Sequence, residues 1–86
     1  MYKIILSTKA TRHTKLLKKS LLEQKARELL DIIKYNPYQP SPPYEKLIGD
    51  YDGAYSRRIN RQHRLIYTVD EKNKEIHVLS MWTHYE

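Results

Sequence analysis

The chain has 86 residues, enough for one domain with a single hydrophobic core, which we assign to residues 1–86. It has no cysteine, which excludes a disulfide framework, a thiolate metal site and a cysteine nucleophile. No apolar run approaches the roughly 20 residues that cross a bilayer, and no secretory signal opens the chain, so we expect a soluble cytoplasmic protein.

The net charge of +6 is unevenly distributed along the chain. Residues 1–36 carry nine Lys/Arg and three Asp/Glu, whereas residues 37–86 carry seven of each. A basic surface of this kind favours a polyanion such as nucleic acid, with binding that weakens steeply as salt rises, and it also suits an acidic protein partner. Charge alone does not separate these two partners.

The first part of the chain predicts one strand and two helices. Residues 2–6 form a short apolar strand, and Ser7 or Thr8 can cap a basic surface helix over residues 9–19. Residues 20–23 read Ser-Leu-Leu-Glu, which predicts a capping box at the start of a second helix.

The second helix is predicted to lie on a sheet, because its apolar residues recur at helical spacing from Leu22 to Ile33. It is expected to end before Pro37, since a residue that precedes proline avoids the helical region. All four prolines lie in residues 37–44, which form a stiff irregular loop that carries residues 44–48 to the sheet.

Residues 55–69 predict a hairpin with one buried and one open face, because two runs of alternating apolar and polar residues flank the polar turn 60–62. A last strand is predicted over residues 76–82. Three successive antiparallel strands make a meander. We therefore predict an α+β fold: an antiparallel, mostly meander sheet, joined by the first strand, with the two N-terminal helices packed on one face.

The open face of the hairpin is predicted to carry four arginines: Arg57, Arg58, Arg61 and Arg64. Like charges so close together disfavour one another, whereas a planar arginine fork suits a phosphate group. A solvated basic edge that prevents aggregation is the alternative explanation. The register of the hairpin also stays open: a turn over residues 60–62 pairs residue 58 with residue 64, whereas a four-residue turn pairs residue 57 with residue 66.

Glu45, Arg64 and His84 are the candidate catalytic residues, and together they suffice for metal-free cleavage of RNA. A free glutamate is ionised and a free histidine is partly protonated near pH 7. Glu45 can take the proton from a ribose 2′-hydroxyl, which then attacks the adjacent phosphorus, while His84 protonates the departing 5′-oxygen. Arg64 and Arg58 would stabilise the charge that builds on the phosphoryl oxygens.

Each candidate also has an ordinary explanation. A glutamate beside a lysine is commonly a surface carboxylate, and a histidine near a C-terminus is commonly frayed. We assign His63 and His77 to strands with local hydrogen bonds, and His13 to a solvated helix position. The histidines lack the spacing of a zinc motif, so we predict no metal and no cofactor.

The hairpin carries a motif that resembles the Txe/YoeB toxins, which belong to the RelE-like group of bacterial toxin–antitoxin systems. It consists of Ser56-Arg57-Arg58-Ile59 followed by His63-Arg64-Leu65-Ile66-Tyr67, and the Pro43-x-Glu45-x-Leu47 element and the terminal His84-Tyr85 also match. The similarity covers the whole chain in length and element order, and residues 43–67 are its most specific part.

The resemblance implies a fold related to microbial ribonucleases and the activity of a ribosome-dependent mRNA interferase, an endoribonuclease that cuts mRNA in the ribosomal A site. It implies that Glu45 is the general base, Arg64 the phosphate-binding residue and His84 the general acid. Arg58 and Tyr85 match substrate-contacting positions. Two further basic residues of the same region complete the RNA-binding candidates: Arg57 and Lys46.

The resemblance also implies partners. These are the 70S ribosome, mRNA, a YefM-like antitoxin that occludes or distorts the site, and operator DNA, which is reached only through the antitoxin complex. A homodimer is compatible with the family. We expect Lys15, Lys18 and Lys19 to dock on ribosomal RNA, because the basic excess lies in the helical half.

Two positions depart from the family pattern. Ile48 stands where many members carry a lysine, a charge for which Lys46 is the nearest substitute, and Glu86 follows the terminal His-Tyr. Two other functions stay open: a ParE-like, non-nucleolytic toxin that acts on gyrase, and a small basic RNA-binding module. The presence of both Glu45 and His84 favours the nuclease, because a gyrase binder has no chemical need for the pair.

Overall fold

The structure is a computed structural model that describes residues 1–82. Within that range the chain forms these elements in order: β1 Lys3–Leu6, α1 Thr8–Lys19, α2 Glu23–Tyr35, β2 Tyr44–Lys46, a 3₁₀ turn Gly49–Tyr51, β3 Tyr55–Arg58, β4 Arg64–Asp70 and β5 Glu75–Ser80. No helix in this part of the chain is long and apolar enough to span a membrane.

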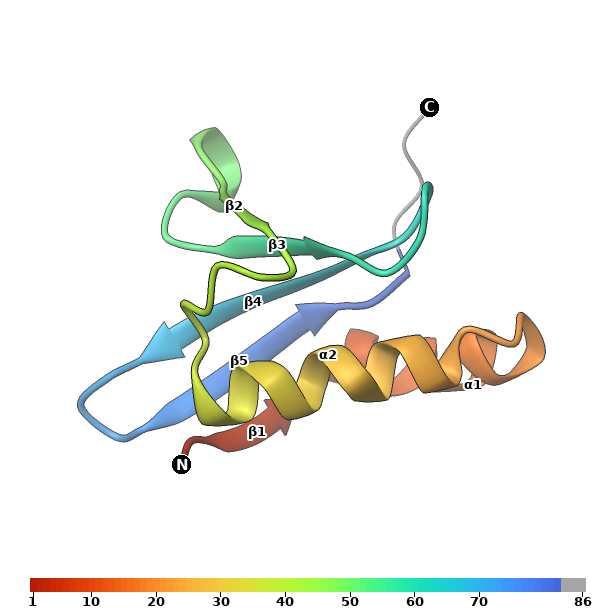
Figure 1. The fold of residues 1–86 in the computed structure, drawn as a ribbon, viewed down its shortest axis with the longest axis horizontal. Coiled ribbons are helices and arrows are strands. Elements are labelled where there is room, and N and C mark those ends of the chain that lie inside the picture. The colour runs from red at the N-terminus through yellow and green to blue at the C-terminus, as the bar shows by residue number, and fades with distance from the viewer. Residues whose placement is uncertain (83–86) are drawn as a thin grey trace.

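All the strands belong to one sheet with the order β1-β5-β4-β3-β2. β2 to β5 pair antiparallel, and β3, β4 and β5 form the predicted meander (Figure 1). β1 pairs with β5 in parallel, so the sheet is mixed, whereas an antiparallel sheet was predicted. The residue pattern does not encode strand direction, and the long connection through both helices lets β1 join the far edge in the parallel sense.

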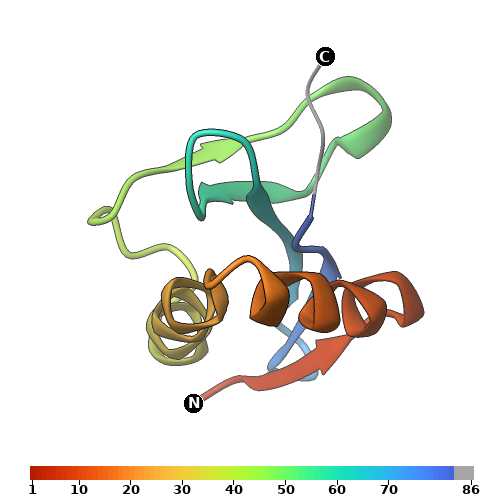
Figure 2. The same ribbon diagram turned by 90° about the vertical axis from the view of Figure 1, so that its right-hand side faces the viewer.

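The two helices pack side by side on one face of the sheet, over β1 and β5, as predicted (Figures 1 and 2). Ser7 caps α1, because its Oγ accepts a hydrogen bond from the Ala10 N–H at 2.9 Å. The apolar stripe of α2 is buried at Ala26, Leu29 and Ile33. The core comprises these buried residues: Ala10, Leu17, Ala26, Leu29, Ile33, Ile59, Leu65, Tyr67, Ile76, Val78 and Met81.

The β3–β4 hairpin adopts the register with the turn over residues 60–62, in which Arg58 pairs directly with Arg64. The side-chain oxygen of Asn60 accepts hydrogen bonds from the backbone N–H groups of Gln62 and His63, and the Ile59 N–H donates to the His63 carbonyl. These bonds fix the turn over residues 60–62. Of the two registers left open by the sequence, the one that pairs residue 58 with residue 64 is therefore confirmed.

The junction between the helices differs from the predicted capping box. Ser20 ends α1 instead of starting α2, and the N-cap of α2 is Leu22, which makes no side-chain cap bond. Leu21 has φ 59°, its N–H donates to the Lys18 carbonyl, and the Leu22 N–H donates to the Leu17 carbonyl. This is the Schellman pattern of helix termination, which satisfies the free carbonyls of α1 before a capping box can form.

Leu21→Gly is expected to stabilise the protein. Leu21 is 90% exposed and takes a left-handed conformation that glycine adopts without steric cost. We expect the free energy of unfolding to rise by about 0.5–1 kcal/mol, measured by chemical denaturation. The matched control is Leu16→Gly inside α1, which should lower it by about 1 kcal/mol; a destabilised Leu21→Gly variant would contradict the assignment.

Candidate functional site

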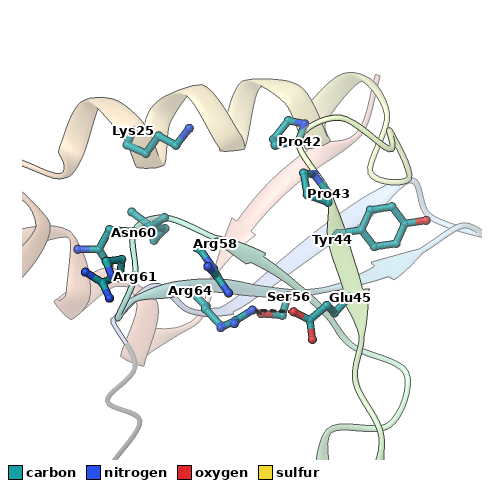
Figure 3. Close-up of a pocket in the computed structure, with 11 residues that line it drawn as sticks. Lys25, Pro42, Pro43, Tyr44, Glu45, Ser56, Arg58, Asn60, Arg61 and Arg64 are labelled. Carbon is teal, nitrogen blue, oxygen red and sulfur yellow. Dashed lines mark hydrogen bonds and ion pairs between the residues drawn. The ribbon is translucent and has the colours of Figure 1, made fainter.

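A hollow of about 590 Å³ lies between α2, the proline-rich loop and the strands β2 to β4 (Figure 3). We call it the cationic hollow, because its lining contains several basic side chains and one carboxylate. Its lining residues are Lys25, Pro42, Pro43, Tyr44, Glu45, Ser56, Arg58, Ile59, Asn60, Arg61 and Arg64.

Glu45 and Arg64 meet in this hollow, as the sequence predicts. Glu45 pairs with Ser56 across β2 and β3, and Arg64 begins β4 on the other side of β3. Arg64 Nη1 lies 3.2 Å from Glu45 Oε1 and 3.4 Å from Ser56 Oγ (Figure 3). The Arg64 side chain is 19% exposed and that of Glu45 is 65% exposed. An ion pair with one partner this exposed is worth at most about 1 kcal/mol, so either group can exchange it for a ligand.

Arg58 and Arg64 are direct cross-strand partners on the same face of the sheet. Two positive charges opposite one another destabilise a strand pair, and a bound anion removes that repulsion. Arg58 is exposed and lines the hollow. The pair is therefore suited to a phosphate group.

Lys25 and Arg61 add two cations to the hollow, from α2 and from the hairpin turn (Figure 3). Arg61 was predicted to lie with the other arginines, whereas Lys25 was missed. Nothing in the sequence around Lys25 points to the hollow, because only the packing of α2 brings it there.

Arg57 does not lie on the open face of the hairpin, where it was predicted to lie. It is fully buried, because the strand alternation turns it away from Ser56 and Arg58 and toward Tyr67. Its guanidinium binds Tyr67 Oη and the carbonyls of Pro37, Gln39 and Pro42. A side chain without exposed surface cannot contact RNA, so the RNA-binding assignment for Arg57 is wrong.

The other predicted site residues that the structure describes are not among those that line the hollow. Lys46 is exposed on β2 but does not line the hollow. Lys15, Lys18 and Lys19 lie exposed on α1, where Lys18 Nζ is 3.8 Å from Glu23 Oε2. His84 and Tyr85 lie outside the described residues, as does Glu86.

The segment that leads to His84 begins beside the hairpin. The Trp82 ring stacks on His63, which directly precedes Arg64, with the ring centres 3.7 Å apart. The Met81 N–H donates to His13 Nδ1 at 3.0 Å, so His13 is not the solvated residue that we predicted. The end of β5 is therefore held close to the strand that carries Arg64.

A separate group of side chains could hold a cation. Ligand atoms of Asp70, Glu75 and His77 lie within 4.8 Å of one another. Asp70 ends the seven-residue strand β4 that Arg64 begins, roughly 20 Å along the strand from the hollow. A cation bound there would be too far away to act on a group in the hollow.

Comparison with known proteins finds similarity over most of the chain. Residues 12–85 match the model of the YoeB-like toxin of bacterial type II toxin–antitoxin systems. The protein named Toxin YoeB from Synechocystis sp. is 33% identical over 58 residues, which are 67% of this chain and 65% of that relative, just under two thirds of its length.

Solved structures also share the fold. A chain of the heterotetrameric YoeB–YefM toxin–antitoxin complex from Staphylococcus aureus is 35% identical, with a TM-score of 0.82 and 99% of each chain covered. A chain of the archaeal RelE–RelB complex from Pyrococcus horikoshii OT3 is 26% identical, with a TM-score of 0.77, 95% of this chain and 93% of that chain covered. The predicted RelE-like fold is confirmed.

The His13–Met81 contact predicts a pH-dependent stability. Burial lowers the pKa of His13 below 6.5, and the neighbouring Lys9, Arg12 and His63 lower it further. The unfolded chain therefore binds a proton at this position more readily than the folded one, and stability falls as the pH drops below about 6.5. His13→Gln should weaken this fall between pH 7 and 5.5 in denaturation experiments. An unchanged pH dependence would show that His13 is not responsible.

Proposed function

The chain belongs to the YoeB-like toxins of bacterial type II toxin–antitoxin systems, and we propose that residues 1–86 form one toxin domain that cuts mRNA in the ribosomal A site. The observation that carries the proposal is the 3.2 Å contact between Glu45 and Arg64 inside a hollow lined by four basic side chains. A carboxylate next to a phosphate-binding arginine is what cleavage through the 2′-hydroxyl requires.

The proposed reaction needs no cofactor. Glu45 takes the proton of the ribose 2′-hydroxyl, and the 2′-oxygen attacks the adjacent phosphorus. The bond from phosphorus to the 5′-oxygen breaks, and His84 gives its proton to that oxygen. The products are a 2′,3′-cyclic phosphate and a 5′-hydroxyl end, so protons and electrons balance.

Arg64 exchanges its partners in this scheme. Without RNA it binds Glu45 and Ser56. When a phosphodiester enters, Arg64 binds the phosphoryl oxygens instead, because an arginine fork can donate two parallel hydrogen bonds to them. The exchange leaves the Glu45 carboxylate available as the base, and Arg58 on the paired strand adds positive charge on the same face.

The role of His84 rests on the sequence resemblance. Trp82 precedes it by two positions and stacks on His63, the neighbour of Arg64. Trp82, the last described residue, therefore lies beside the hairpin turn. Tyr85, which follows His84, is proposed as a further substrate contact.

The ribosome is the proposed partner of the basic helix α1. Lys15, Lys18 and Lys19 are spaced i, i+3 and i+4, so they share one face of the helix, and all three are exposed. Because α1 does not line the hollow, this face can bind ribosomal RNA while mRNA occupies the hollow. Action on the ribosome places the protein in the cytoplasm.

A YefM-like antitoxin is the second proposed partner. The similar Staphylococcus aureus structure is a YoeB–YefM complex, and the net charge of +6 suits an acidic polypeptide. Operator DNA is proposed to be reached only through that complex.

Substitution of the reacting groups tests the nuclease. Glu45→Gln and His84→Gln should each lower the rate of mRNA cleavage on programmed ribosomes by about 10²–10⁴-fold, the usual contribution of a general base or acid. Arg64→Ala should cost at least about 10²-fold, because it removes charge stabilisation. Glu28→Gln, an exposed carboxylate on α2, is the control that leaves the rate unchanged. Full activity of Glu45→Gln, or inhibition of gyrase without any cut mRNA, would contradict the proposal.

Neutralising the α1 lysines tests ribosome docking. The triple variant Lys15→Gln, Lys18→Gln and Lys19→Gln should bind 70S ribosomes more weakly, with a salt dependence reduced by up to about one unit of slope for each lost phosphate contact. Antitoxin binding should stay largely intact. Lys3→Gln with Lys72→Gln, both exposed outside α1, is the control, and the loss is compared per lysine removed. Equal losses in the triple and control variants would mean that α1 is not the docking face.

A further inference from the structure

Arg57 is a buried charge whose hydrogen bonds all go to neutral partners. The residue is fully buried, and within residues 1–82 no carboxylate forms an ion pair with it. Its Nε donates to Tyr67 Oη at 3.0 Å. Burial of a charge without a carboxylate partner is costly, and here its hydrogen bonds to neutral acceptors offset that cost. Removing the arginine would in turn leave those acceptors without their donor. Arg57 and the conformation of the groups that it binds therefore depend on each other.

The acceptors of Arg57 lie along one loop. Nη1 donates to the Pro42 carbonyl at 2.6 Å, and Nη2 donates to the carbonyls of Pro37 and Gln39 at 3.0 and 2.9 Å. Tyr67 Oη also donates to the Pro37 carbonyl, at 2.7 Å. Since the loop has no helix or strand of its own, one guanidinium supplies hydrogen bonds along most of its length.

This loop runs directly into the strand that carries Glu45. β2 has only three residues and lies at the edge of the sheet, so its own ladder fixes it weakly. Arg57 pairs with Tyr44 in that ladder, and its guanidinium lies 4.8 Å from the centre of the Tyr44 ring. On the other side of Glu45, the Leu47 N–H donates to the Ala54 carbonyl at 2.9 Å. Arg57 therefore fixes the segment immediately before Glu45.

We propose that Arg57 is a positioning residue of the nuclease site: by binding three loop carbonyls and the Tyr44 ring, it holds the Glu45 carboxylate in place against Arg64. This inference rests on the proposed function of Glu45. Arg57 touches neither substrate nor reacting atoms. Its effect on the reaction passes through the loop and β2, from the buried side of the sheet to the open side.

A double-mutant cycle separates positioning from general structural support. Cleavage is measured in single turnover with toxin in excess over programmed ribosomes, so that binding does not limit the rate. Arg57→Met should lower the rate constant at least about tenfold in the chain with Glu45, and Arg57→Lys should lower it less. In the Glu45→Gln background, Arg57→Met should cost less than about twofold, because the group that it positions is already absent.

Ile76→Ala is the control for lost stability, since Ile76 is fully buried in β5 at the end of the sheet away from Arg64. With a similar loss of unfolding free energy, it should leave the rate constant within about threefold as long as the chain is folded. Amide hydrogen exchange supplies a readout without activity. In Arg57→Lys, exchange at residues 44–47 should accelerate at least about tenfold while α2 is unchanged.

The outcomes are distinguishable. Equal losses from Arg57→Met in both backgrounds, or unchanged exchange in β2, would overturn the positioning role and leave the proposed nuclease intact. A wild-type rate for Glu45→Gln alone would overturn the nuclease proposal and the positioning role with it. If Arg57→Met does not fold, the same cycle is run with Arg57→Lys.

Discussion

The register of the β3–β4 hairpin is the constraint on which the site depends. Arg58 lies opposite Arg64, and the hydrogen bonds of Asn60 fix the turn that produces this pairing. Because side chains alternate between the faces of a sheet, a slip by one residue would turn Arg57 to the open face and bury Arg58. The same slip would break the hydrogen bonds that Arg57 donates to the proline-rich loop.

Two neighbouring arginines thus have opposite tasks. Arg57 is enclosed and binds the backbone of the proline-rich loop, whereas Arg58 is exposed and lines the cationic hollow. The loop delivers Glu45 to the edge of the sheet, where it meets Arg64. In the proposed nuclease, the loop anchor and the reaction centre therefore lie on the two faces of one short strand. We propose that the chemistry of the open face depends on hydrogen bonds on the buried one.

Much of the fold was predictable because local patterns and long-range packing agree. The helical spacing of α2, the stop before Pro37 and the alternation of the hairpin are each visible in a few residues. The failures have specific causes. The predicted capping box over residues 20–23 does not form, since Leu21 takes a left-handed conformation that a leucine rarely adopts. The direction of β1 is set by a connection too long for any local signal.

The site was predictable in part for the same reason. Glu45 and Arg64 are recognisable by their motifs. The burial of Arg57 depends on the hairpin register and on the proline-rich loop that its guanidinium binds, which the residues around it do not reveal. Lys25 enters the hollow through helix packing alone. Ile48, where many family members carry a lysine, is 85% exposed and does not line the hollow, nor does Lys46 replace that charge there. The cations that do line it, Lys25 and Arg61, come from other elements.

In the proposed reaction, Glu45 activates a ribose 2′-hydroxyl beside a phosphate held by Arg64. The most direct test uses an mRNA with a single 2′-deoxynucleotide on the 5′ side of the cleaved bond in the A site of a programmed ribosome. We expect this one substitution to abolish the cut at that bond while the toxin still binds the ribosome. Cleavage of the deoxy-substituted bond at the normal rate would contradict it.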